Sequence, residues 1–312
     1  MEKKHIPEKK KAYSLSLCDG AQWQIRGQGD ISEWIDRLAS IIEIKPCHST
    51  EVGNRLLFAF GEINEDAVAD FTQWGYVPLE KNGWRSLRYQ SLRFWYHKDF
   101  ADVLCEVRNK NKYVSNPHYD HRYATMSGFL HPICYESIRR KGLPLHTGMI
   151  ERYGQAVLLA GSGGTGKSTA CRRFPASQGK ALCDDGTLVL RDQNGVFRAH
   201  PLPTWSDFSM RRQEKTWNME YSVPVSAIFI LEKAPSEEVI PVGEGHAAIL
   251  INQSSAQSGG AFWHAWDKAE QMKIRQLVFR NACEMAKAIP VFRLRLTLHG
   301  NFWEYIEKAM GW

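Results

Sequence analysis

The chain has 312 residues, of which 43% are hydrophobic and 24% are charged, and its formal net charge is +6 at pH 7. This composition is that of an ordinary globular protein with one large domain or two modest ones. The positive charge is too small to indicate a nucleic-acid partner. No apolar run approaches the roughly 20 residues of a membrane-spanning helix, so we expect no membrane partner.

The N-terminus and the cysteines favour a cytoplasmic protein. Residues 1–11 are rich in lysine, and no apolar signal-peptide core follows them. The 7 cysteines include no C-x-x-C pair. We therefore expect reduced thiols in a cytoplasmic protein, without a disulfide framework or a structural zinc site.

Residues 1–120 predict an N-terminal α+β domain, with a possible docking or substrate role that only its position suggests. Hydrophobic periodicity predicts alternating helices and strands. The predicted helices cover residues 30–40 and 64–74, and the predicted strands cover residues 55–61, 84–96 (a hairpin) and 102–108.

Basic and aromatic residues alternate along the predicted hairpin, which contains Arg85, Arg88 and Arg93. An RNA-binding sheet can show this mixture, but no RNP-type motif accompanies it. We favour a half-buried antiparallel hairpin whose cations face water.

Residues 109–121 are polar and turn-forming, which predicts a domain boundary near residue 120. His118, Asp120 and His121 could ligate a metal, although a solvated loop is the favoured interpretation. Residues 121–312 then form the second predicted domain, which opens on a helix over residues 128–140.

A glycine-rich motif dominates the second domain. Residues 155–160 predict a buried strand, residues 161–168 match G-x-x-x-x-G-K-[ST], and residues 169–174 can open a helix. Such a loop turns its backbone N–H groups onto phosphate oxygens at the positive end of the helix. The candidate nucleotide-binding residues are Gly161, Ser162, Gly163, Gly164, Thr165, Gly166, Lys167, Ser168 and Thr169.

This motif predicts binding of ATP and Mg²⁺. Lys167 would reach the β- and γ-phosphates, and the Ser168 hydroxyl would ligate Mg²⁺. A glycine-rich turn that holds no ligand is the alternative interpretation, and the flanking strand and helix disfavour it.

Asp184 and Asp185 end a short strand that begins at residue 180. One carboxylate could support Mg²⁺ while its neighbour accepts the proton of an incoming hydroxyl. One of the pair could instead merely cap a turn. Asn194-Gly195 then predicts a β-hairpin over residues 187–199, where a Ras-like protein would place a crossover helix.

The rest of the chain supplies supporting elements. Two prolines order the loop at residues 200–207, in which Trp205 or Asp207 could touch a substrate or simply pack. Arg211 and Arg212 could neutralise a transferred phosphoryl group or be an exposed pair. Core elements are predicted over residues 225–231 (strand), 266–288 (helix), 291–298 (strand) and 302–310 (helix).

Together these motifs resemble the kinases related to HPr kinase/phosphorylase, whose P-loop domain is similar to that of phosphoenolpyruvate carboxykinase. The shared features are a histidine seven residues before Tyr153-Gly154, the glycine-rich loop, and the acidic pair that opens a hairpin. Within that group the sequence looks most like the ScmC proteins of SynChlorMet peptide-modification cassettes. The resemblance implies an α/β fold with a mixed sheet over residues 121–312.

The resemblance also implies residue roles. Lys167 and Ser168 would bind the phosphates and Mg²⁺, Asp185 would be the metal-side acid, and Asp184 would be the base. His146 would lie near the transferring phosphate, although a packed loop histidine is the alternative interpretation.

The expected function is therefore an ATP- and Mg²⁺-dependent kinase that transfers the γ-phosphate to a hydroxyl on a ribosomally made peptide. One alternative is a nucleotide-gated module that binds a peptide or partner without phosphorylating it. Another is a kinase of a free small molecule, such as an amino acid or a polyol. The sequence leaves a homo-oligomer open.

Overall fold

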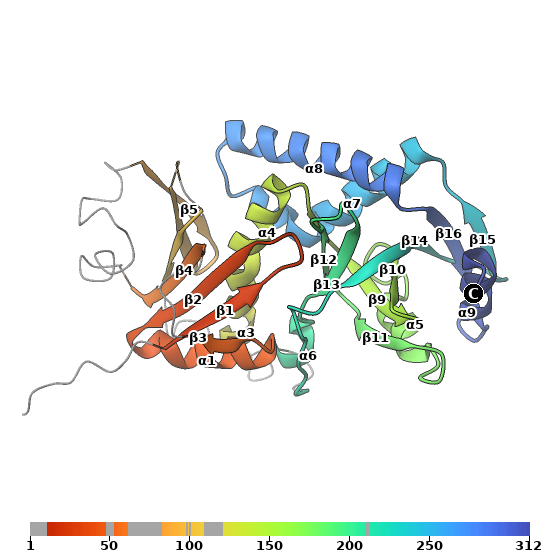
Figure 1. The fold of residues 1–312 in the computed structure, drawn as a ribbon, viewed down its shortest axis with the longest axis horizontal. Helices are drawn as coiled ribbons and strands as arrows, with labels where there is room; N and C mark the ends of the chain where they lie inside the picture. The colour runs from red at the N-terminus through yellow and green to blue at the C-terminus, as the bar shows by residue number, and fades with distance from the viewer. Residues whose placement is uncertain are drawn as a thin grey trace, which may run out of the picture.

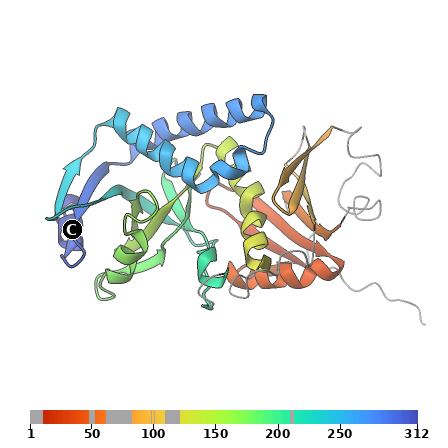
Figure 2. The same cartoon turned by 180° about the vertical axis from the view of Figure 1, so that it is seen from behind.

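The computed structural model describes residues 11–47, 53–61, 83–97, 99, 101–108, 121–209 and 213–312. Two β-sheets lie at opposite ends of an elongated molecule, and helices stand between and above them (Figure 1, Figure 2). The predicted helix over residues 64–74, the side chains of His118, Asp120 and His121, and the pair Arg211-Arg212 lie outside the described residues.

The N-terminal sheet has seven strands in the order β3-β1-β2-β4-β7-β6-β5, and helix α1 covers it. Parallel pairs β2·β4 and β4·β7 sit among antiparallel ones, so the sheet is mixed. The predicted helix at residues 30–40 and the predicted strands are confirmed, each within two residues. The elements are β1 Ala12–Ser16, β2 Gln22–Gln28, α1 Ser32–Ile41, β3 Lys45–Cys47, β4 Asn54–Phe60, β5 Trp84–Tyr89, β6 Leu92–His97 and β7 Val103–Val107.

The predicted hairpin at residues 84–96 is antiparallel, with Leu87 opposite Phe94. Both of these residues are buried, whereas Arg85 and Arg88 are exposed. This alternation gives β5 one dry face and one wet face. The prediction is wrong for Arg93 of β6, whose side chain is 15% exposed and lies 3.8 Å from the buried Glu106 carboxylate.

The C-terminal sheet has nine strands and is also mixed. Its central strand β14 is parallel to β10 and β16 and antiparallel to β13. The predicted hairpin after the acidic pair is confirmed as β12 and β13, with Leu188 opposite His200. The strands are β8 Leu143–Leu145, β9 Thr147–Arg152, β10 Gln155–Ala160, β11 Lys180–Cys183, β12 Thr187–Arg191, β13 Phe197–Pro201, β14 Val223–Lys233, β15 Glu238–Pro241 and β16 Val291–Leu296.

Helices α4, α7 and α8 fill the space between the sheets and cover the upper side of the molecule in Figure 1. No described helix is both long enough and apolar enough to cross a bilayer. The helices are α3 His121–Met126, α4 His131–Arg139, α5 Lys167–Arg173, α6 Trp205–Ser209, α7 Glu244–Trp263, α8 Lys268–Ala288 and α9 Phe302–Met310.

One hydrophobic cluster runs from the N-terminal sheet into the C-terminal one. Phe58 of β4 stacks on Phe129, just before α4, with ring centroids 4.3 Å apart. The division of the chain near residue 120 therefore remains a prediction, because the core does not separate there.

His200 of β13 ties the two regions together. Its Nδ1 donates to the Met219 carbonyl at 2.8 Å, and its Nε2 accepts the backbone N–H of Cys18 at 3.3 Å. Because its ring is fully buried, desolvation lowers the pKa of His200 from 6.5 to about 4. Burial lowers the pKa of His131 to about 4 as well.

Because His131 and His200 have lowered pKa values, we expect the folded state to lose stability at acidic pH. Their pKa values in the folded state lie below the unfolded value. Their contribution to the free energy of unfolding is therefore complete above pH 6.5 and is lost as the pH falls to about 4. The expected loss is on the order of 3 kcal/mol for each ring. Urea unfolding between pH 7 and pH 4 measures it.

Glutamine cannot be protonated in this range, so His200→Gln should reduce the slope of unfolding free energy against pH. Replacing the exposed His264 with glutamine should leave that slope unchanged. A His200→Gln variant with the slope of the unaltered chain would show that His200 does not carry the effect.

Candidate active site

The loop Gly161–Ser168 joins the end of β10 to the start of α5. Gly164 and Gly166 have φ values of 79° and 110°, a region that side chains disfavour. Gly166 is the N-cap of α5, and no side chain caps the first turn. The N–H groups of this turn therefore remain available to a ligand.

Lys167 is 6% exposed, and its ammonium folds back over the loop. Its Nζ donates to the carbonyls of Gly161 at 2.8 Å and Ser162 at 3.3 Å. Burial lowers the pKa of Lys167, while the nearby carboxylates of Asp185 and Asp184 oppose that shift. The positive charge thus lies between the loop and the acidic pair.

The acidic pair follows β11, which pairs with β9 at the edge of the sheet. Asp184 is half-buried, and its Oδ1 accepts the Thr204 hydroxyl at 2.6 Å. Asp185 keeps half of its side chain exposed. The two neighbours therefore differ: one carboxylate is held in place and the other is open to solvent.

His146 lies beside Asp185. Its Nδ1 is 2.9 Å from the Asp185 carbonyl and 3.5 Å from the Asp185 carboxylate. Because a carbonyl can only accept, Nδ1 carries the hydrogen and Nε2 is left for another partner. Burial, and to a smaller extent the charge of Lys167, lower the pKa of His146. The negative charge of Asp185 and the hydrogen bond to its backbone oppose this shift.

His146 lies between β8 and β9, and β9, which follows it, is held to the neighbouring strand and helix. Thr147 and Thr187, both fully buried, share a 2.7 Å hydrogen bond between β9 and β12. A Cβ at Gly148 would come within 2.5 Å of the Cys171 sulfur on α5. This close approach lets α5 and the glycine-rich loop lie directly against β9.

The structure places His146 next to Asp185, and α5, which carries Lys167, next to the end of β11, which Asp184 and Asp185 follow; the roles of these four residues stay predictions. Asp207 is instead fully buried and paired with Lys215 at 2.9 Å, so it is a packed connector. The hydrogen-bond partner Thr204 and the paired threonines were not predicted, because they follow no motif and meet the site only through the fold.

The Mg²⁺ ligands predicted here are Ser168 and Asp185. Within the described ranges, no group of three His, Cys, Asp or Glu side chains could hold a metal ion. Two protein ligands suit Mg²⁺ nonetheless, since it keeps several waters and takes substrate phosphates as ligands.

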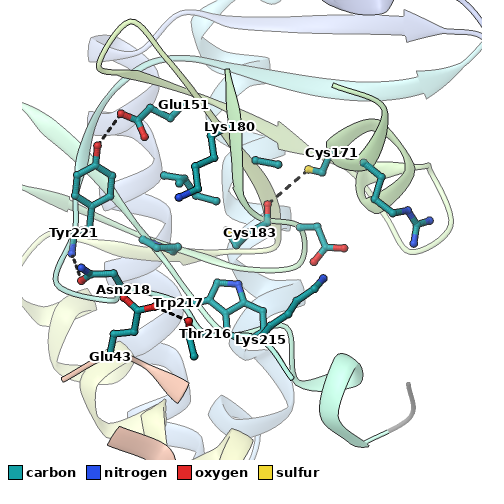
Figure 3. A pocket seen from close by; sticks show the side chains of 15 residues that line it. Glu43, Glu151, Cys171, Lys180, Cys183, Lys215, Thr216, Trp217, Asn218 and Tyr221 are labelled. Carbon is teal, nitrogen blue, oxygen red and sulfur yellow. Dashed lines mark hydrogen bonds between the residues drawn. The ribbon is translucent and has the colours of Figure 1, made fainter. Parts of the chain in front are cut away.

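A cavity of about 580 Å³ opens next to Asp184. Figure 3 shows its walls, which come from β9, β11, the segment before β14 and the end of α1. The lining residues include Glu43, Glu151, Cys171, Arg172, Lys180, Cys183, Asp184, Lys215, Thr216, Trp217, Asn218 and Tyr221.

The fold thus defines a mixed α/β protein. In its candidate site, a glycine-rich loop lies between a strand and the helix that carries Lys167, and His146 and the two carboxylates lie beside it. The family model described as "SynChlorMet cassette protein ScmC" matches residues 103–311. The chain belongs to this family, as its motifs predict. A search of curated proteins found no match to the chain.

Proposed function

We propose that this protein is a kinase that transfers the γ-phosphate of ATP to a hydroxyl acceptor. The observation that carries the proposal is the contact between α5 and the end of β11, where the Cys171 Sγ donates to the Cys183 carbonyl at 3.6 Å and so holds the acidic pair beside the helix that carries Lys167. A phosphate-binding loop alone supports nucleotide binding. The carboxylate of Asp184, which the Thr204 hydroxyl holds in position beside the loop, supports phosphoryl transfer.

ATP would lie with its phosphates along the loop, where backbone N–H groups and the Lys167 ammonium meet negative charge. Ser168 and Asp185 would hold Mg²⁺, which neutralises charge on the phosphates. This assignment follows the likeness to kinases related to HPr kinase/phosphorylase, including a P-loop fold of that type.

Asp184 would accept the proton of the acceptor hydroxyl. Its hydrogen bond from Thr204 fixes one oxygen and leaves the other free to face the acceptor. The neutral ring of His146, which carries its hydrogen on Nδ1, would accept a hydrogen bond at Nε2 near the transferring phosphoryl group. Each group then has one task, and none must change place during the reaction.

The acceptor we favour is a peptide, because the resemblance to the proteins of SynChlorMet cassettes, which the family match supports, implies a peptide-modification pathway. A nucleotide-gated binding module would share the loop but would not need Asp184. A kinase of a free amino acid or polyol would share every catalytic group.

The decisive experiment incubates the protein with ATP, Mg²⁺ and candidate acceptors, beginning with small peptides encoded beside its gene. ADP should form only when a hydroxyl acceptor is present, and mass spectrometry should find that acceptor heavier by one phosphoryl group. Chelating the metal should stop both. Equal ADP formation with and without an acceptor would contradict the proposal.

A further inference from the structure

The cavity beside Asp184 has two ends of different character. Near Asp184 the wall includes Arg172, which follows the Cys171 that bonds to the Cys183 carbonyl, and Lys215, whose charge is neutralised by its pairing with Asp207. Glu43 and Glu151 lie on the other side of the cavity in Figure 3, one above and one below, with Tyr221 and Asn218 drawn between them. The cavity therefore runs from the proposed base to a pair of carboxylates.

Glu43 and Glu151 are oriented by neutral hydroxyls. Glu43 accepts the Thr216 hydroxyl at 2.5 Å, and Glu151 accepts the Tyr221 hydroxyl at 2.7 Å. Within the part of the chain that the structure describes, neither carboxylate forms an ion pair. Each carboxylate has room to accept further hydrogen bonds.

Lys180 is a cation at this end, because β11 places it opposite Glu151. It balances one of the two negative charges and leaves the other in excess. Glu43, Lys180 and Asn218 are exposed, so this end opens to solvent and a longer chain can leave through it.

The backbone at Glu43 gives an independent sign of a role. Glu43 has a φ of 54°, just after the end of α1, where Ile44 N–H bonds to the Ala39 carbonyl at 3.0 Å. Helix ends of this type usually place glycine at this position, because other residues are strained there. Strain that persists in a cavity wall points to a side chain that is used.

The segment that faces Glu43 is anchored to the same helix end. The Trp217 N–H bonds to the Ile41 carbonyl at 2.8 Å, and the Met219 N–H bonds to the Ile42 carbonyl at 3.2 Å. Trp217, which is 5% exposed, belongs to the hydrophobic core and so fixes this segment. The N-terminal region thus contributes Glu43 to the cavity wall.

We propose that this cavity takes a hydroxyl-bearing peptide segment with its hydroxyl at Asp184 and a lysine or arginine side chain between Glu43 and Glu151. This inference rests on the proposed kinase function and adds the class of acceptor to it. The volume is within the range of about 300–1,000 Å³ that ligand pockets occupy.

A positional-scanning library of serine peptides tests the inference, with lysine, arginine, glutamine or glutamate fixed at one position at a time. Incorporation of ³²P from labelled ATP should favour lysine and arginine about tenfold over glutamate at one position, which corresponds to one charge pair. Glu43→Gln and Glu151→Gln should each reduce that preference, and the double variant should abolish it.

Glu284→Gln, which changes an exposed carboxylate on α8, is the matched control and should keep the preference. Glu43→Gly separates folding from recognition, because glycine suits the backbone there while the carboxylate is lost. This variant should unfold at no lower temperature than Glu43→Gln and should still lose the preference.

Peptide phosphorylation without a basic preference, or a preference that both glutamine variants keep, overturns the inference and leaves the kinase proposal standing. Phosphorylation of free serine or glycerol, but of no peptide, also overturns the inference and leaves the kinase proposal standing. ATP turnover on none of these acceptors overturns both.

Discussion

Replacing Asp184 with asparagine is expected to slow phosphoryl transfer by about 10²–10⁴-fold, the usual contribution of a positioned general base. Asparagine has the same shape and can still accept the Thr204 hydroxyl through its side-chain oxygen. It cannot take the proton of the acceptor. The affinity for ATP should therefore change little, and steady-state rates together with nucleotide titration measure the two quantities separately.

Asp185→Asn is the matched comparison, since it removes the neighbouring, half-exposed carboxylate. That variant should need more Mg²⁺ and should recover part of its rate as Mg²⁺ is raised, whereas Asp184→Asn should not. If Asp184→Asn retains the function of the unaltered chain, the nucleotide-gated binding module becomes the better explanation.

The second large effect is expected for Lys167→Ala. The lysine ammonium lies over the loop carbonyls at the place proposed for the phosphates, and its removal leaves their charge without its main partner. Loss of one such positioned group costs about 10²–10³-fold in rate. Both the rate and the affinity for ATP should fall, unlike in Asp184→Asn.

Lys287→Ala is the control for Lys167→Ala, because Lys287 is an exposed lysine on α8 that pairs with Glu284. It should leave the rate and the affinity within error. A Lys167→Ala variant that binds and uses ATP normally would show that the glycine-rich loop is not the phosphate site.

The parts of the site that the sequence predicts are those encoded by neighbouring residues. Gly166 sets the start of α5, and Asp184 follows its strand directly, so their placement depends on few distant contacts. The hairpin after the acidic pair is equally local, since the turn residues select it.

Residues that meet only through tertiary contacts could not be predicted in this way. Thr204 reaches Asp184 across 20 positions, and Glu43 reaches Thr216 across 173. The helix α7 was missed for another reason. Its sequence is rich in serine, glutamine and glycine, and it is helical because it packs between α8 and β8.

The anchoring of residues 217–219 to the end of α1 has an evolutionary consequence. The family match begins at residue 103, the first residue of β7, so the stretch that carries Glu43 lies outside the shared region. Glu151, by contrast, lies inside that region. Under the proposed function, one carboxylate of the acceptor site is therefore shared with the family region and the other is supplied by the N-terminal sheet region, which shares one hydrophobic core with it.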